Sequence, residues 1–231
     1  MLLVVKTASI LLNNKLEENT DHFLTNSQIH YLKKVLKIQE NENFNAFDGM
    51  GHKGTCKFIS NDQIKILEIQ SFPKVFKTSV LIPIMKKVQF EFCLQKVIEL
   101  GVDNIFCYPS EKTSDKYNLK NVKEKLERYQ DIIESAFLQS ENKYLPKLNF
   151  INNLFEFSFN DYLDVCVLNQ NAERKFSSND NWDLIISGGE FGFSENELAF
   201  LRKTKASFVK LSENILRAET APLVALSIQN I

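Results

Sequence analysis

The sequence predicts an α/β protein, with a mostly parallel sheet covered by helices and a smaller β-rich domain before it. From about residue 73 onward, short apolar runs of strand length alternate with segments whose apolar residues recur every three or four positions. Such alternation is typical of a parallel sheet with helices on both faces. Residues 1–72 instead contain β-type runs separated by turn signals. Because Pro73 marks the change of pattern, we expect domains at 1–72 and 73–231.

Length and composition fit a packed protein of one large domain or two modest ones. The 231 residues are 44% hydrophobic and 11% aromatic. No apolar run approaches the roughly 18 residues that a membrane helix needs. The opening MLLVVKTASILL resembles a buried first strand more than a secretory leader. We therefore expect a cytoplasmic protein without a membrane partner.

The cysteines and histidines argue against metal and triad chemistry. The four cysteines form no CxxC pair, which indicates buried thiols and no zinc site or redox dithiol. All three histidines fall at or before His52, so the rest of the chain cannot supply a Ser-His triad or a histidine metal ligand. The net charge of −1 means that a nucleic-acid partner would require a local basic patch.

In the first domain, the strand pattern is interrupted by one helix. The cluster Asp48-Gly49-Met50-Gly51 predicts a turn between two strands. The spacing of Ile29, Leu32, Val35 and Leu36 predicts a helix over 27–37 with these residues on one face. Three lysines lie on the other face, where they form either a solvated surface or an RNA-binding patch; they are Lys33, Lys34 and Lys37.

The first part of the second domain supplies most of the alternation. Strands are predicted at 79–84, 104–108, around Leu148 and at 164–168, with helices over about 90–98 and 122–137 and a short helix around Leu154. Gly101 reads as a helix stop. The order is strand, helix, strand, as a parallel sheet requires.

The last 49 residues contain two further strand–loop–helix units. The apolar run 183–187 leads into the glycine-rich loop 188–192, and Ser194 and Glu197 have the spacing of a capping box for a helix from Glu195. A second run, 207–211, leads into a polar loop and a helix with Pro222 in its first turn. We expect the two strands to lie side by side, with their loops adjacent.

These loops have the composition of a ligand site. Glycines at 188, 189 and 192 let the backbone approach a ligand closely, although they also suit a plain tight turn. Arg217 and Glu219 would hold charge at the edge where α/β proteins bind ligands. The first loop reads GGEFG and not GxGxxG, which argues against a nicotinamide oxidoreductase.

Both loops resemble the C-terminal motifs of the SPOUT superfamily of methyltransferases. SGGEFGFS at 187–194 and LSENILRAETA at 211–221 are similar to the motifs IGPEGGFS and LGxRILRxETA of the 16S ribosomal RNA uridine-N3 methyltransferases, the small ribosomal subunit RNA methyltransferase E family. QKVIELGVDNI, SEKTS and SAFLQS also resemble that family, as does HYLKKVLKIQENENFNAFDG in the first domain. The resemblance covers nearly the whole chain.

The resemblance implies a fold, a reaction and partners. It implies a trefoil knot in the second domain, a PUA-like RNA-binding β-barrel in the first, and a homodimer. The reaction would be methylation of uridine N3 in 16S ribosomal RNA of the small ribosomal subunit, with S-adenosyl-L-methionine as cofactor and no metal. The implied cofactor-binding residues are Leu168, Gly188, Gly189, Glu190, Gly192, Leu211, Ser212, Ile215, Leu216 and Ala221.

The catalytic residues that we expect are Arg217 and Glu219. Uracil N3 carries a proton at neutral pH, so the reaction needs a proton acceptor or positive charge beside the developing anion. Arg217 suits the second role because a guanidinium keeps its charge when desolvated. Glu219 and Glu190 are candidate bases, or they cap the last helix and fix the first loop, respectively.

Several positions depart from the family motifs. Gly189 stands in place of proline, Phe191 and Ser212 in place of glycines, and Asn142 and Asn214 in place of arginines. These departures support an alternative function, that of a non-catalytic RNA-binding protein of ribosome assembly with a decayed cofactor pocket.

Overall fold

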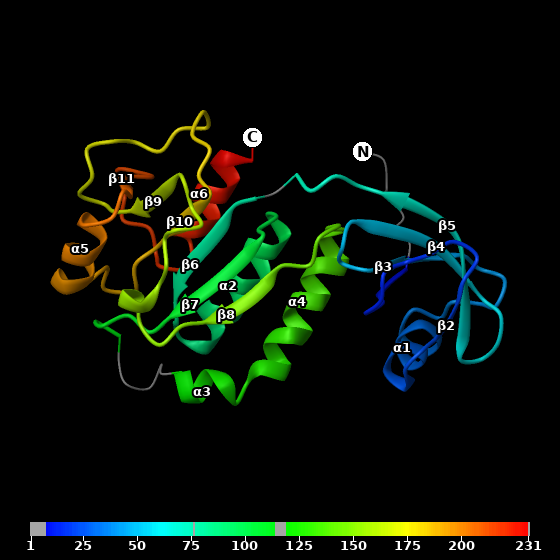
Figure 1. Cartoon of the computed structure of the whole chain (residues 1–231). Helices are drawn as coiled ribbons and strands as arrows, with labels where there is room; N and C mark the ends of the chain where they lie inside the picture. Colours follow the sequence, from blue (N-terminus) through cyan, green and yellow to red (C-terminus); the bar gives the residue numbers. More distant parts are fainter. Residues whose placement is uncertain (1–7, 76, 114–118, 231) are drawn as a thin grey trace. The chain divides into compact units, whose positions relative to one another are not determined.

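The computed structural model describes residues 8–75, 77–113 and 119–230 (Figure 1). The chain forms two compact units, Met1–Val75 with Phe137–Leu145, and Phe76–Ala136 with Pro146–Ile231. The domain boundary at 72/73 remains a prediction. No sequence pattern predicted that residues 137–145 belong to the first unit. The predicted strand in the first seven residues lies outside the described residues.

The first unit is built on a five-stranded sheet with the order β1-β3-β4-β5-β2. β1 pairs with β3 in parallel, and the other pairs are antiparallel. The β-rich first domain is therefore confirmed, with β1 and β2 as the edge strands. The strands are β1 (Ser9–Leu11), β2 (Asp21–Phe23), β3 (Phe44–Phe47), β4 (His52–Phe58) and β5 (Gln63–Ser71).

The helix predicted over 27–37 is shorter and changes its winding. α1 (Asn26–His30) is capped by Thr25, whose Oγ1 accepts from the Gln28 amide at 3.2 Å, and continues as one π-helical turn, η1 (Tyr31–Val35). A π turn has more residues per turn than an α-helix, so it rotates the later side chains around the axis. Val35 is consequently 56% exposed, and its predicted place on the buried face is wrong.

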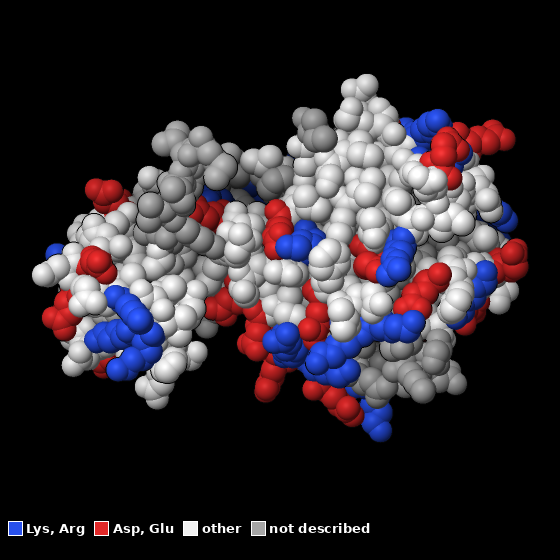
Figure 2. Space-filling model, turned by 180° about the vertical axis from the view of Figure 1, so that it is seen from behind, with Lys and Arg blue, Asp and Glu red and all other residues white. Residues whose placement is uncertain are grey.

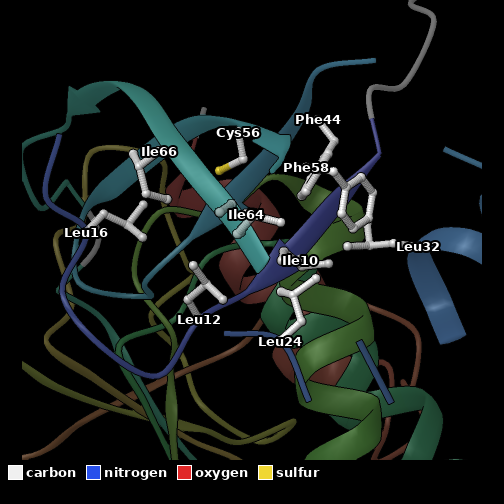
Figure 3. Packing of buried hydrophobic residues seen from close by; sticks show 11 residues of the cluster. Ile10, Leu12, Leu16, Leu24, Leu32, Phe44, Cys56, Phe58, Ile64 and Ile66 are labelled. Carbon is white, nitrogen blue, oxygen red and sulfur yellow. The ribbon is translucent and has the colours of Figure 1, made fainter. Parts of the chain in front are cut away.

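The core of the first unit lies under this sheet and helix (Figure 3). Aromatic rings of Phe44 and Phe58 pack at 5.4 Å between centroids. The predicted turn at 48–51 joins β3 to β4, and the buried Asp48 carboxylate accepts from the amides of Met50 and His52 at 2.7 and 3.1 Å. Buried side chains of the core include Ile10, Leu12, Leu16, Leu24, Leu32, Cys56, Ile64 and Ile66.

The second unit contains a six-stranded, wholly parallel sheet, which confirms the predicted α/β class. Its order is β11-β9-β10-β6-β7-β8. The knot remains a prediction. The strands are β6 (Ser79–Pro83), β7 (Asn104–Tyr108), β8 (Lys147–Phe150), β9 (Val165–Leu168), β10 (Leu184–Ile186) and β11 (Ser207–Val209). The helices that begin in this unit are α2 (Lys87–Glu99), α3 (Leu119–Lys123), α4 (Leu126–Ser140), the 3₁₀ turn η3 (Leu154–Glu156), α5 (Glu195–Arg202) and α6 (Ala221–Gln229). The last residues of α4, from Phe137, belong to the first unit.

Helices cover both faces of this sheet, because successive strand residues point to opposite faces and the central strands are buried throughout. On one face, Phe90 of α2 packs edge-on against Tyr129 of α4 at 5.1 Å. On the other, Leu81 and Leu184 share a cluster with Leu201 of α5. The sheet is therefore a rigid support for the loops at its strand ends.

The prediction that the last two strands, β10 and β11, lie side by side is wrong. β9 lies between β10 and β11, with Ile185 opposite Cys166 and Phe208 opposite Val167. The sequence pattern shows where strands are but not which of them pair, and here the chain leaves β10, passes β9 and forms β11 at the outer edge of the sheet. A third loop, the one after β9, therefore lies between the two motif loops.

The cysteines are buried thiols, as predicted. Burial raises the pKa of Cys56 and Cys93 to about 12 each. In the described part of the chain, no helix has the length and apolar character to cross a membrane.

Candidate functional site

A pocket of about 340 Å³ lies at the carboxyl ends of β9, β10 and β11, where α/β proteins bind ligands. Nine of the ten predicted cofactor-binding residues line it: Leu168, Gly188, Gly189, Glu190, Gly192, Leu211, Ile215, Leu216 and Ala221. Residues without a predicted role also line it, among them Lys112, Asn169, Gln170, Asn171, Phe191, Phe193 and Ala218.

The glycine loop after β10 is held by a buried side chain of β7 and by a hydrogen bond within its own backbone. The buried Tyr108 hydroxyl donates to the carbonyl of Ser187 at 2.9 Å, and the Gly192 amide donates to the Gly189 carbonyl at 2.9 Å. Gly192 has a φ of +69°, which favours glycine, whereas Phe191 is not among the residues with positive φ. The loop therefore needs glycine at 192, where this chain keeps it, and accepts a side chain at 191.

Glu197 fastens this loop to the loop after β7. The predicted capping box is present: Ser194 Oγ accepts from the Glu197 amide at 2.9 Å, and the Glu197 carboxylate accepts from the Ser194 amide at 2.7 Å. The same carboxylate accepts from Ser110 Oγ at 3.3 Å and from the Glu111 amide at 3.1 Å. Glu197 is completely buried, so this network has a structural role beyond capping the helix.

The loop after β9 holds the motif loop after β11. Gln170 Nε2 donates to the carbonyls of Ser212 and Glu213 at 3.1 and 3.0 Å. Of this region, the sequence prediction included only Leu168. The signal that it missed is the polar run Asn169-Gln170-Asn171 directly after a buried strand.

Three predicted residues lie outside the lining of the pocket. Ser212 Oγ instead accepts from the Asn214 amide at 3.1 Å. Arg217 points to solvent with 82% of its side chain exposed, and its Nη1 lies 3.9 Å from Oε1 of Glu219, which is 13% exposed. The catalytic roles of Arg217 and Glu219 stay predictions.

The pocket has a buried floor and an exposed rim. Leu168 and Ala218 are each 8% exposed and Phe193 is 6% exposed. Phe191 and Ile215 are 71% and 87% exposed. A ligand in this pocket would therefore have apolar contacts below and two large, uncovered apolar side chains beside it.

Charged groups at the rim are partly neutralised. Lys86, after β6, forms an ion pair with Glu190 at 3.1 Å. Lys112, after β7, donates from Nζ to the carbonyl of Phe191 at 3.4 Å. Burial raises the pKa of the Cys93 thiol in α2, and the nearby negative charge of Glu219 raises it further.

The three lysines predicted to bind RNA differ in environment. Lys33 Nζ donates to Asn61 at 2.8 Å and lies 4.9 Å from the centre of the Phe58 ring. Lys34 and Lys37 are exposed. On the face shown in Figure 2, basic and acidic side chains are interspersed. RNA binding by these lysines stays a prediction.

Metal ligands do not gather in this region. Among the described residues, no group of three or more His, Cys, Asp or Glu side chains could hold a metal ion.

Comparison with known proteins agrees with this geometry. A family model of the RNA methyltransferase domain matches residues 72–230, and one of the RNA methyltransferase PUA domain matches residues 24–69. A ribosomal RNA small subunit methyltransferase E 2 of Borreliella burgdorferi is 31% identical over 157 residues, 66% of this chain and 65% of that protein. A ribosomal RNA small subunit methyltransferase E of Buchnera aphidicola is 28% identical across 96% of this chain and 92% of that protein.

A solved structure shares the fold over nearly the full length. The ribosomal RNA small subunit methyltransferase E of Neisseria gonorrhoeae, bound to S-adenosyl methionine, has a TM-score of 0.83 at 24% identity and covers 96% of this chain and 95% of that one. The first family model alone spans more than half of the chain, including every strand of the parallel sheet. The chain therefore belongs to the RNA methyltransferase family.

Proposed function

We propose that this protein is an S-adenosyl-L-methionine-dependent methyltransferase that methylates N3 of a uridine in 16S ribosomal RNA of the small ribosomal subunit. The observation that carries the proposal is the convergence of both motif loops on one pocket at the carboxyl ends of β9, β10 and β11. The relatives named as small-subunit methyltransferases support the choice of RNA. We further propose that it acts in the cytoplasm as a homodimer.

The pocket fits an adenosyl cofactor in size and chemistry. Its volume of about 340 Å³ lies in the range of small-molecule sites. Leu168, Leu211 and Leu216 offer apolar surface for a purine, and the backbone of 188–192 offers amides and carbonyls for polar edges. When bound, the cofactor supplies a methyl group activated by its sulfonium charge. The chain's task is then to hold the acceptor in line with that methyl group.

Arg217 is the residue proposed to stabilise the uracil anion. Its guanidinium is exposed and lies 3.9 Å from one carboxylate oxygen of Glu219, so it is free to reach a base that enters from solvent. Its backbone carbonyl accepts from the amides of Thr220 and Ala221 at 2.9 and 3.0 Å, which fixes the start of its side chain relative to α6.

Of the two candidate bases, Glu219 has the better surroundings for proton transfer. Glu190 is paired with Lys86 at 3.1 Å, which supports a role in fixing its own loop. Glu219 is 13% exposed and its contact with Arg217 is long, so its carboxylate keeps acceptor capacity. We propose Glu219 as the proton acceptor.

Cofactor binding is the first test. Titration calorimetry and thermal shift with S-adenosyl-L-methionine should show binding, with NADH as the negative control. Absence of any shift would favour the alternative of a non-catalytic assembly protein.

The second test replaces Arg217. We expect Arg217→Ala to lower methyl incorporation into isolated small subunits about 10²–10³-fold, as loss of one directed donor to a developing anion does. Cofactor affinity should stay the same, because Arg217 is not among the residues that line the pocket. Partial rescue by Arg217→Lys would indicate charge, and no rescue would indicate directed hydrogen bonds.

Arg202→Ala is the matched control, since Arg202 is an exposed arginine in the last turn of α5. Wild-type turnover in Arg217→Ala would remove Arg217 from the mechanism.

Light scattering tests the homodimer: a monomeric mass at micromolar concentration would contradict it.

A further inference from the structure

We propose that Phe191 is a stacking platform for a nucleobase of the RNA substrate at the rim of the pocket. This inference rests on the proposed function, since it assumes that the acceptor is RNA. It concerns a residue that stands where the family motif has glycine, so it is a property of this chain.

The position of Phe191 suits an external ligand and not the protein's own core. Its side chain is 71% exposed, whereas Phe193, two residues later, is 6% exposed and belongs to the core cluster under α5. Phe191 lines the pocket together with Gly188, Gly189 and Gly192. The loop that carries it is fixed by the Tyr108 and Glu197 hydrogen bonds, so the ring is presented from a firm base.

The surroundings favour a nucleotide over an apolar protein surface. Lys112 lines the same pocket and its Nζ donates to the backbone carbonyl of Phe191 at 3.4 Å, which places a cation on the same part of the rim as this residue. The neighbouring Glu190 is paired with Lys86. An aromatic face next to positive charge matches a base and its phosphate, the combination that single-stranded RNA presents.

Stacking also suits the reaction. A ring that holds uracil by its face leaves the base edge, including N3, open to methyl transfer and to Arg217. Recognition through the base edge would instead occupy the atoms that must react. Ile215, 87% exposed on the same pocket, offers a second apolar contact to a base in this place.

Kinetics of Phe191→Ala test the proposal. The KM for isolated small subunits should rise about tenfold, because stacking on an aromatic side chain typically contributes enough for such a factor. The Kd for S-adenosyl-L-methionine should change less than this KM, because Phe191 lies on the exposed rim of the pocket and not on its buried floor. Phe191→Trp should keep or lower the KM. Leu163→Ala is the matched control, since Leu163 is an 87% exposed apolar residue before β9, at the opposite end of that strand from the pocket.

Fluorescence of Phe191→Trp gives a readout independent of turnover. A uridine oligonucleotide should quench the emission of the new indole. In wild type the emission should not change, because the single native tryptophan, Trp182, is 5% exposed. If the oligonucleotide quenches the emission of Phe191→Trp but the KM of Phe191→Ala equals that of wild type, stacking has no role in catalysis and the proposal is wrong.

Two other outcomes are distinguishable. If wild type transfers no methyl group to small subunits, the proposed function fails, and absence of quenching by the oligonucleotide then overturns the stacking proposal separately. If Phe191→Ala changes the mass in light scattering but not the KM, the ring covers a second copy of the chain, and the nucleobase proposal is wrong.

Discussion

The two motif loops are held in different ways. The loop after β10 is fixed by hydrogen bonds that involve buried groups, above all the completely buried Glu197 and the Tyr108 hydroxyl. The loop after β11 is held by the exposed Gln170 and by ion pairs of Lys210 and Lys175 with Glu213, a residue 70% exposed.

Buried hydrogen bonds stabilise a loop more than exposed ion pairs do, because water competes for the groups of an exposed pair. We infer that the loop after β10 is formed before a ligand arrives, and that the loop after β11 gains order from the ligand. The loop after β10 carries the backbone groups proposed to bind the cofactor. The loop after β11 carries Arg217, which is proposed to stabilise the uracil anion.

The largest expected effect is that of Glu197→Ala. It leaves Ser110, Glu111 and Ser194 without their acceptor inside the protein, so the free energy of unfolding should fall by about 3 kcal/mol. Urea denaturation measures this. Glu195→Ala, in the same first turn but exposed, should cost less than about 1 kcal/mol. An equal loss of unfolding free energy in both variants would show that the buried hydrogen-bond network does not stabilise the protein.

Replacement of Gly192 separates backbone strain from bulk. At a φ of +69°, Gly192→Ala should cost about 1–2 kcal/mol and weaken binding of S-adenosyl-L-methionine. Gly192→Asn should cost less in both measurements, since asparagine tolerates this conformation. No atom lies within 4 Å of an added Cβ, so a clash is not the cause. An asparagine variant worse than alanine would refute the strain argument.

Gln170→Ala tests the weaker hold on the second loop. The free energy of unfolding should change by less than about 1 kcal/mol, because the two hydrogen bonds are exposed. Cofactor affinity, measured by calorimetry, should fall all the same, since Gln170 sets the position of residues 212–213. Gln170→Glu keeps the size but loses the donors, so it should not restore affinity; restoration would mean that only bulk matters.

Glu213→Ala should have the smallest effect, a melting temperature equal to that of wild type at pH 7 in 0.15 M salt. Hydrogen bonds from Lys210 and then Lys175 lower the pKa of Glu213 below its usual 4.5. A lowered pKa in the folded state stabilises the protein above pH 4.5, and this contribution is lost as the pH falls below that value. Because Glu213 is exposed and salt screens its ion pairs, the contribution is too small to change the melting temperature at pH 7. A clear loss at pH 7 would contradict the weak hold assigned to this loop.

Much of the fold was predictable because it depends on residues close together in the sequence. Apolar periodicity gave the strands and helices of the parallel sheet, and the spacing of Ser194 and Glu197 gave the start of α5. The resemblance of the two motif loops to a known family implied eight of the residues that line one pocket. The strands, the helices and the helix cap are each set by neighbours within about one helical turn or one strand.

The rest was decided by pairing between distant parts of the chain. The position of β9 between β10 and β11 brings Gln170 into the site, and no local pattern encodes which strands become neighbours. Glu197 was predictable as a cap, but its bonds to Ser110 and Glu111 join residues 87 and 86 positions apart. The outward direction of Arg217 likewise follows from how its loop meets α6. Such contacts depend on the packing of the whole sheet, so only the tertiary structure fixes them.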